Sequence, residues 1–457
     1  MKTRMTLNHR LGWPRRWAQA VLVALGWGLT VATAQASLPI EHWTQPSGAR
    51  IYVVHSANLP MLDVQIDVDA GSRRDPRDRA GLAQAVAQMY DKGVRAHAGR
   101  PALDENQLVE SWADLGAQFR VQATADRLSF QLRTLTRPDL LDPAVTLMAH
   151  QLAAPAFPQA VWARERERLV AAWRQAQTQP GTVAARRFAE AVYGDHPYGQ
   201  EARPETWAAI DSADLEGFVR RHVRACDARV TLVGDVQRAQ ADAIVSRLLA
   251  GWADRPCTPL PPVAEVAPLA RAQLVQVPFE AAQAQILIGQ PGFPRSDPDF
   301  LALTVGNHIL GGSGFTSRLM QEIRERRGLT YGIYSYFSPG RHAGAFTVSM
   351  QTRPDQAEEA VRLIHEEIRR FVAEGPTPQE LAEAQQALIN GFALRLDSNR
   401  KWLDNVAAMA WNDLPLDYLD TWTAQIAALT PAQVRAAMQR VLQPDRLVTV
   451  VVGGRQP

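Results

Sequence analysis

Two glutamines four residues apart are the first residues of this chain whose spacing suggests chemistry. Gln84 and Gln88 lie in the segment "GLAQAVAQMYDKG" (81–93), which predicts an amphipathic helix with a glycine stop. Residues four apart on a helix share a face, and this spacing can present two metal ligands together. Glutamine is a poor zinc ligand, however, and Ala87 between the pair carries no acid or base. The larger apolar residues of the segment form one stripe: Leu82, Val86 and Met89.

Other motifs that carry chemistry are incomplete. His365 opens a sequence that begins like the zinc motif H-E-x-x-H, but the last position is Arg369. The run "GGSGF" (311–315) lacks the last glycine of G-x-S-x-G and the Lys-Ser/Thr ending of a phosphate loop. None of the ten histidines has a second histidine three or four residues away. The motifs alone therefore indicate no self-sufficient catalytic site.

The composition is that of a soluble globular protein of more than one domain. The 457 residues are 46% hydrophobic and 21% charged, and the chain is too long for one ordinary core. The 49 Lys and Arg residues nearly balance the 47 Asp and Glu residues, and no basic run stands out. We therefore expect no nucleic-acid partner.

The first 36 residues have the three parts of a secretory signal peptide. A basic stretch ends at Arg16 and is followed by an apolar run (20–32) and the small residues of Ala34-Gln35-Ala36. Because the run is short for a membrane span, we expect cleavage after Ala36 and a periplasmic or secreted chain with no stable membrane span. The alternative is that this segment is retained as an anchor.

Two cysteines, Cys226 and Cys257, are too few for a cysteine-rich zinc site. Disulfides persist in an exported protein, so the two could pair, and two unpaired thiols are the other possibility. The sequence leaves this choice open.

The chain is a duplicated unit with a proline-rich linker between the copies. The linker "RPCTPLPPVAEVAPLA" (255–270) has no helical or strand period. It separates an N-terminal domain (37–254) from a C-terminal domain (271–457) that resemble each other in three blocks, in the same order and at nearly one offset. Matching pairs include Leu82 with Leu301, Val86 with Val305, Gly93 with Gly312 and Val233 with Val452.

Both copies mix strand and helix patterns. Alternating or β-branched segments predict strands and longer amphipathic segments predict helices, without strict β-α-β alternation, which favours an α+β fold. The predicted strands include 61–71, 126–135, 228–235 and 446–454, and the predicted helices include 104–116, 159–177 and 377–394.

The run "AGSRRDPRDRAGLAQAVAQMYDKG" (70–93) resembles the zinc-site region of the pitrilysin/insulinase family of zinc metallopeptidases, the inverzincins. That family has H-x-x-E-H on a helix, followed by M-x-x-K-G. The two histidines bind zinc and the glutamate activates water. The resemblance implies that Gln84 and Gln88 stand at the histidine positions and Ala87 at the glutamate position.

The resemblance also implies a fourth zinc-site position, about seven residues after a Glu-Arg pair. Counting from Glu165-Arg166 gives Ala172, and counting from Glu167-Arg168 gives Arg174. Neither is a carboxylate, so all four positions are expected to be degenerate and this chain is expected to bind no cofactor. The alternative is an active metallopeptidase whose site lies elsewhere in the chain.

The C-terminal copy keeps more of the family pattern. "ILGGSGFTSRLMQEIRERRGLTYGIYSYF" (309–337) resembles the second-domain signature, with its glycine-rich loop and R-E-x-x-G-L-x-Y. The resemblance implies that Arg324 and Tyr331 contact substrate near the scissile bond. We expect Arg324 in the last turn of a helix closed by Gly328 and Tyr331 on the strand that follows. Without the resemblance, the pair would be an ordinary exposed arginine and a half-buried tyrosine.

The glycines of the same signature allow two interpretations. Gly311, Gly312 and Gly314 are typical of a flexible connection between a helix and a strand. The resemblance implies instead that they line the peptide-binding chamber.

The resemblance covers nearly the whole mature chain and implies two homologous, tandem, clam-like domains. It predicts a catalytically incomplete subunit that forms a heterodimer with a zinc-bearing sibling, with zinc on that partner, and that supplies Arg324 and Tyr331 for the hydrolysis of peptides. The alternative is a non-catalytic peptide-binding or scaffold protein of the periplasm.

Overall fold

The computed structural model describes residues 38–253 and 255–453. The expected signal peptide, 1–36, and its cleavage site after Ala36 lie outside the described residues. In the described part of the chain, no helix is both long and apolar enough to cross a membrane.

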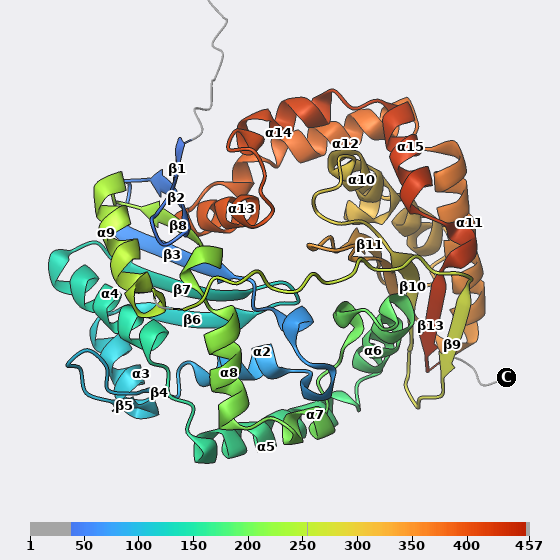
Figure 1. Cartoon of the computed structure of the whole chain (residues 1–457). Helices are drawn as coiled ribbons and strands as arrows, with labels where there is room; N and C mark the ends of the chain where they lie inside the picture. Colours follow the sequence, from blue (N-terminus) through green and yellow to red (C-terminus); the bar gives the residue numbers. More distant parts are fainter. Residues whose placement is uncertain (1–37, 254, 454–457) are drawn as a thin grey trace, which may run out of the picture. The chain divides into compact units, whose positions relative to one another are not determined.

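The chain forms two mixed sheets (Figure 1). The first has the order β1-β2-β8-β3-β7-β6, with β1 (Ile40–Thr44), β2 (Arg50–His55), β3 (Met61–Val68), β6 (Gln118–Ala123), β7 (Leu128–Leu135) and β8 (Arg229–Gly234). The second has the order β11-β12-β10-β13-β9, with β9 (Gln273–Val277), β10 (Ala284–Pro291), β11 (Ile333–Phe337), β12 (Ala345–Thr352) and β13 (Val448–Val452). A short pair joins β4 (Gly93–Val94) to β5 (Leu103–Asp104).

Helices follow the strands in the same order in both halves. The N-terminal half contains α2 (Leu82–Met89), α3 (Glu105–Asp114), α4 (Pro138–Ala153), α5 (Gln159–Ala176), α6 (Pro180–Tyr193), α7 (Pro204–Ala208), α8 (Ser212–His222) and α9 (Arg238–Leu249). The C-terminal half contains α10 (Phe300–Asn307), α11 (Ala357–Glu374), α12 (Pro378–Asn390), α13 (Asn399–Trp411), α14 (Tyr418–Ala427) and α15 (Pro431–Val441).

The two sheets repeat one pairing scheme. In the first, β3 lies antiparallel to both β7 and β8, and β2 runs parallel to β8. In the second, β10 lies antiparallel to β12 and β13, and β9 runs parallel to β13. The duplication read from the sequence is therefore a duplication of topology, and the prediction of an α+β fold with two homologous domains is confirmed.

Local sequence signals explain where several elements begin and end. Asp104 accepts a hydrogen bond from the Gln107 backbone N–H in a capping box at the start of α3. Gly116, two residues beyond the end of α3, has a φ of +57°. Thr377 caps α12 in the same way, but this helix ends at Asn390 rather than at the predicted residue 394. Gly391 follows at once, and glycine is a poor helix former.

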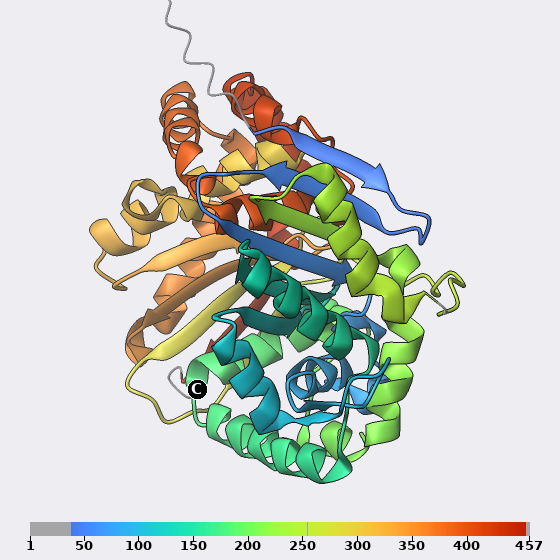
Figure 2. The same ribbon diagram turned by 90° about the vertical axis from the view of Figure 1, so that its left-hand side faces the viewer.

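Each sheet is covered on one face by a helix from the other half. Helix α13 packs on β8 and β3, where Trp402, Leu403 and Val406 meet Val233 of β8. In turn α6 packs on β10 and β13, where Phe188 belongs to the same buried cluster as β-strand residues of the second sheet. Helices α4 and α9 cover the opposite face of the first sheet (Figure 2). The exchange of α6 and α13 gives each half part of the other's core.

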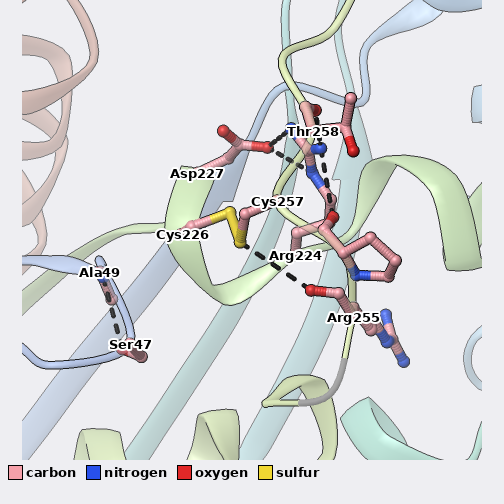
Figure 3. Close-up of a disulfide and its surroundings, with 9 residues drawn as sticks. Ser47, Ala49, Arg224, Cys226, Asp227, Arg255, Cys257 and Thr258 are labelled. Carbon is pink, nitrogen blue, oxygen red and sulfur yellow. Dashed lines mark hydrogen bonds and ion pairs between the residues drawn. A yellow bond between two sulfur atoms is a disulfide. The ribbon is translucent and has the colours of Figure 1, made fainter.

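The start of the linker is fastened to the N-terminal half (Figure 3). Cys226 and Cys257 form a disulfide across a sequence separation of 31 residues, which settles the choice that the sequence left open. Beside it the buried Arg224 pairs with Asp227 and donates hydrogen bonds to the carbonyl oxygens of Pro256 and Thr258. The linker is therefore tied down at its first residues.

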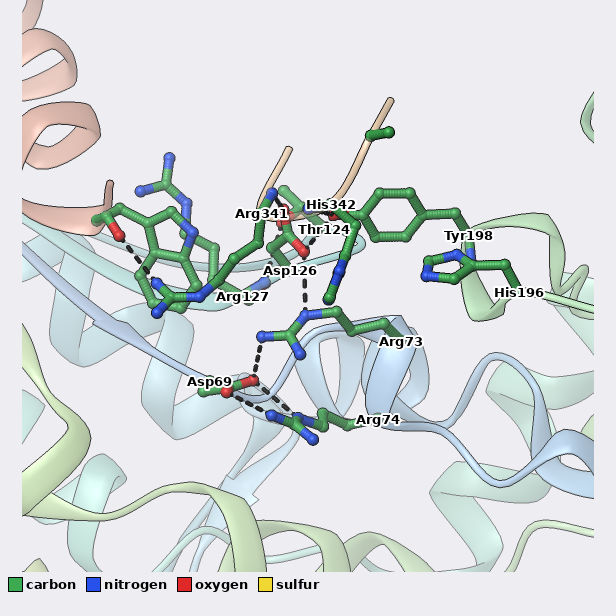
Figure 4. Close-up of polar contacts among 12 residues, drawn as sticks. Asp69, Arg73, Arg74, Thr124, Asp126, Arg127, His196, Tyr198, Arg341 and His342 are labelled. Atoms are coloured by element: carbon green, nitrogen blue, oxygen red, sulfur yellow. Dashed lines mark hydrogen bonds and ion pairs between the residues drawn. The ribbon is translucent and has the colours of Figure 1, made fainter. Parts of the chain in front are cut away.

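A polar cluster around Asp126, in the turn between β6 and β7, joins the two halves (Figure 4). Its carboxylate accepts hydrogen bonds from Tyr198 Oη (2.6 Å) and from the backbone N–H of Arg341 (2.8 Å), and it pairs with Arg73 Nε (3.0 Å). The backbone N–H of His342 donates to Tyr198 Oη. Burial, together with the neighbouring Asp126 carboxylate, raises the pKa of Tyr198, so its hydroxyl remains a donor.

Candidate functional site

Helix α2 carries the three residues that the resemblance places at zinc-site positions of the family, Gln84, Ala87 and Gln88. Its apolar stripe is buried against the first sheet, as predicted. On the other side, Gln84 is exposed, and Ala87 and Gln88 are half-buried. The sequence therefore builds the predicted helix and buries its apolar stripe, with two amides and a methyl group where the family's zinc site has imidazoles and a base.

The N-terminus of α2 is held by a buried carboxylate. Asp75 accepts hydrogen bonds from the backbone N–H groups of Gly81 (2.8 Å) and Ala83 (3.0 Å). Burial raises the pKa of Asp75 to about 7, against these hydrogen bonds, which lower it. The helix start is thus anchored by a group that titrates near neutral pH.

A cavity of about 520 Å³ opens beside Ala87 and Gln88. Its walls come from the end of α2, from the edge strand β6, from α5 and from α13. Arg400 of α13 reaches this cavity although it belongs to the C-terminal half. The helix exchange is therefore what completes the wall.

The acidic residue on α5 that lines this cavity is Glu165, not the residue found by counting along the chain. Glu165 is only 8% exposed and lies in the cavity wall with Gln88. Ala172, the expected fourth position, is exposed about two helical turns further along α5 and does not line the cavity. The assignment of the fourth zinc-site position to Ala172 stays a prediction, and Glu165 of the same Glu-Arg pair is the residue that shares the cavity wall with Gln88.

Glu165 is already neutralised by arginines. Arg164 Nη2 lies 2.9 Å from Glu165 Oε1, and Arg168 Nη1 lies 3.2 Å from Oε2. A zinc ion needs several N, S or O donors that are free to coordinate it. In the described ranges, no group of three or more His, Cys, Asp and Glu side chains is placed to hold a metal ion. These residues do not fit zinc.

Arg324 and Tyr331 lie together on the C-terminal half. Arg324 lies in a π-helical turn, η8 (Met320–Glu325), and the backbone N–H of Gly328 donates to its carbonyl oxygen. Its Cζ is 4.7 Å from the ring centre of Phe315 and 5.7 Å from that of Tyr331, and its guanidinium also pairs with Glu325. The aromatic rings hold the cation by cation–π contacts.

Tyr331 is not on the strand. Strand β11 begins at Ile333, so Tyr331 belongs to the loop before it, and its side chain is 93% exposed. Tyr331 precedes the strand by two residues, so the prediction that places it on the strand is wrong. Thr330 Oγ1 accepts a hydrogen bond from the Gly332 N–H and donates to the carbonyl oxygen of Gln351, which holds this loop at the sheet edge.

The three glycines of the second-domain signature lie in helical turns rather than in an extended loop. Gly311 and Gly312 end the turn η6 (His308–Gly312), and Gly314 opens η7 (Gly314–Thr316). A Cβ on Gly311 would come within 2.4 Å of Ser335 Oγ on β11. Close packing against that strand therefore accounts for Gly311, and a lining role in a chamber stays a prediction.

Known proteins agree with this architecture. Residues 50–204 match the model of insulinase (peptidase family M16), and residues 209–388 match the model of the peptidase M16 inactive domain. A crystal structure from Pseudomonas fluorescens, described as a peptidase M16 inactive domain, superposes with a TM-score of 0.86 at 32% identity, over 92% of this chain and 98% of that chain. The chain belongs to peptidase family M16.

Proteins with lower sequence identity to this chain include some that are named as proteases. An uncharacterized zinc protease of Streptomyces coelicolor is 25% identical, over 88% of this chain and 87% of its own. YmxG of Bacillus subtilis, also named an uncharacterized zinc protease, is 21% identical over 79% and 85%. The periplasmic protease PqqL of Escherichia coli has a TM-score of 0.77 at 19% identity, over 92% of this chain and 46% of that chain, which is a likeness of fold.

Sequence reasoning missed several residues that lie beside the candidate positions. The only sequence signal for Glu165 is its place between two arginines on a predicted helix, at the start of the pair from which Ala172 was counted. Phe315 appeared only as the residue that ended a glycine run. Arg400 had no local signal, because it reaches the cavity only through the exchange of α13.

Proposed function

We propose that this chain is a catalytically incomplete M16 subunit that pairs with a zinc-bearing sibling and supplies Arg324 and Tyr331 to a peptide substrate. The observation that carries the proposal is the half-buried Arg324, packed on Phe315 beside the exposed Tyr331, in a chain whose own α2 has no zinc donors. The guanidinium and the phenol are donors held at the surface, suited to a peptide carbonyl or a developing oxyanion.

Zinc in this arrangement belongs to the sibling. There it would activate the water that attacks the peptide bond. The residues of this chain would bind and orient the peptide backbone, with Arg324 held by ring contacts and the exposed Tyr331 hydroxyl donating a hydrogen bond to a substrate oxygen.

The proposed location is the periplasm or the exterior, after cleavage at Ala36. The disulfide between Cys226 and Cys257 supports it, because disulfides persist in oxidising compartments. The likeness of fold to a periplasmic protease is consistent with this location.

The first test is affinity purification of the mature chain from its native compartment, with co-purifying chains and zinc quantified. We expect a zinc-bearing M16 chain of similar size at near one-to-one stoichiometry. If the chain arrives alone and without metal, the two-subunit proposal loses its support and a peptide-binding or scaffold role replaces it.

The second test is Arg324→Ala in the reconstituted complex. Loss of one donor to a developing oxyanion costs about 100-fold or more in kcat, so peptidase activity should fall by that order while assembly, measured by size exclusion, is unchanged. Arg326→Ala is the matched control, because Arg326 is an exposed neighbour that pairs with Glu322. A scaffold would be indifferent to both substitutions, so equal activity of the two variants would contradict the catalytic role.

A further inference from the structure

Basic side chains outnumber acidic side chains in the wall of the cavity beside α2. A zinc site of the family would bind a cation here, yet four basic and two acidic side chains line the cavity: Lys92, Arg120, Arg168 and Arg400 against Asp91 and Glu165. Lys92 is paired with Glu105 and Asp91. Arg168 is paired with Glu165. Arg400 is paired with Asp404, so the unpaired positive charge left to a ligand among these lining residues is that of Arg120, with the Arg400 guanidinium as a second donor.

Arg120 is the freer of the two. It lies on β6 with its side chain exposed, and within residues 38–253 and 255–453 it makes no side-chain hydrogen bond or ion pair. Arg400 donates from Nη2 to Gln131 Oε1 at 3.1 Å and pairs with Asp404 on its own helix. Both arginines therefore keep guanidinium N–H groups for an incoming anion.

The two arginines are neighbours on one face of the sheet. Arg120 lies directly opposite Gln131 in the antiparallel ladder of β6 and β7, and residues opposite each other share a face. Gln131 is in turn the hydrogen-bond partner of Arg400. Gln131 is thus the shared neighbour of the two arginines, one from each half of the chain, in the wall of the cavity.

Strand β6 also offers a backbone to a peptide. It is the last strand in the order of the first sheet, so one of its sides is unpaired within the described part of the chain. An extended peptide can add to such an edge through main-chain hydrogen bonds. A peptide lying along β6 would carry its side chains or its terminus past Arg120.

We propose that this cavity binds the carboxylate of an extended peptide, with Arg120 and Arg400 as its cationic ligands. The planar guanidinium fork matches a carboxylate in two parallel hydrogen bonds. This inference rests on the proposed role in holding peptides and names the peptides that the chain selects: those with an acidic side chain or a free C-terminus at this point.

The test is fluorescence anisotropy of the purified chain with three ten-residue peptides that carry the same label. The first has a central glutamine and an amidated C-terminus, the second a central glutamate and an amide, and the third a central glutamine and a free carboxylate. We expect one or both acidic peptides to bind about tenfold more tightly than the neutral peptide at low salt. The peptide that shows the preference identifies the source of the carboxylate.

The preference for acidic peptides should disappear in the double variant Arg120→Gln/Arg400→Gln, so that all three peptides bind with affinities within about twofold of the neutral peptide's. In the native chain the same preference should shrink as the salt concentration rises. Arg362→Gln is the matched control, because Arg362 pairs with Glu366 four residues away on α11 as Arg400 does with Asp404 on α13. Thermal melting confirms that each variant is folded.

Three outcomes separate the inference from the function on which it rests. A preference that the double variant loses and the control keeps supports the carboxylate site. Equal binding of all three peptides, or a preference that survives in the double variant, overturns the site but leaves peptide binding intact. Binding of none of the peptides overturns both the site and the peptide-holding function.

Discussion

Glu165 is a buried carboxylate whose partners are arginines. Its place beside Gln88, in a wall shared with Ala87, is one from which an acid could meet a metal held by α2. Here two guanidinium groups satisfy it instead, at 2.9 and 3.2 Å. A buried carboxylate without a partner is costly. The arginines therefore stabilise a charge that no metal ion is placed to stabilise.

Restoring the lost donors tests this interpretation of Glu165. The triple substitution Gln84→His, Ala87→Glu and Gln88→His should give a chain that binds about one zinc ion, measured by isothermal titration and elemental analysis. Adding Glu165→Gln should weaken zinc binding at least about tenfold, because a residue that coordinates the zinc ion directly is lost.

Two comparisons complete that experiment. Adding Arg168→Ala to the restored chain should strengthen zinc binding, because Arg168 competes for Glu165. Adding Ala172→Glu should change little, since Ala172 does not line the cavity. Zinc binding that is indifferent to Glu165 would show that the fourth position lies elsewhere.

At the scale of single elements, helix α2 depends on a residue outside it. Gly81, its first flanking residue, has no side chain to cap it, and Asp75 supplies the missing acceptors from six residues upstream. Hydrogen bonds from backbone N–H groups ordinarily favour the charged form of a capping carboxyl group. Here burial outweighs them and raises the pKa of Asp75 to about 7.

The raised pKa of Asp75 predicts a pH dependence of stability. The folded chain keeps this proton up to about pH 7, whereas the unfolded chain loses it near the usual 3.8. The stabilising contribution is therefore complete below pH 4 and is lost as the pH rises to 7. The free energy of unfolding of the native chain, relative to Asp75→Asn, should fall over this range by at most about 4 kcal/mol.

Denaturant unfolding at pH 4.5, 6.0 and 7.5 measures this difference. The exposed Asp139 is a control, because the hydrogen bond from Arg137 lowers its pKa and its titration is complete below these values. Asp139→Asn should therefore give a nearly constant difference. A constant difference for Asp75→Asn as well would show that Asp75 titrates normally.

At the scale of the whole molecule, the exchange of α6 and α13 makes the halves interdependent. The buried cluster under α13 combines Val54 and Val233 of the first sheet with Trp402 and Val406 of the second half. A separated N-terminal half would expose this apolar face to water, which costs free energy in proportion to its area. The Asp126 cluster adds polar contacts between the two halves.

Fragments 38–254 and 255–457 should therefore fold poorly alone and recover structure when combined, as judged by circular dichroism and size exclusion. Val406→Asp in the second fragment should prevent recovery, because it buries a charge in the shared cluster. Lys401→Ala on the same helix is half exposed and should permit recovery. Cooperative unfolding of either fragment alone would contradict the interdependence.

Local patterns in the sequence were enough for the elements and for the repeat. The alternation in 61–71 became β3, the apolar stripe became the buried side of α2, and the matching blocks became two sheets with one pairing scheme. The loss of zinc donors at Gln84, Ala87 and Gln88 also follows from residue identity alone, because side-chain chemistry does not depend on the fold.

Contacts between distant segments were decided only by the tertiary structure. The pairing of Cys226 with Cys257, the place of Glu165 in the cavity wall and the arrival of Arg400 from the other half all depend on how elements pack. Periodicity reports which side of a helix is apolar, but it does not report which element covers that side. The sequence by itself determined that α2 of this M16 chain carries no zinc donors at Gln84, Ala87 and Gln88. The packing of helices exchanged between the two halves decided which side chains surround these positions.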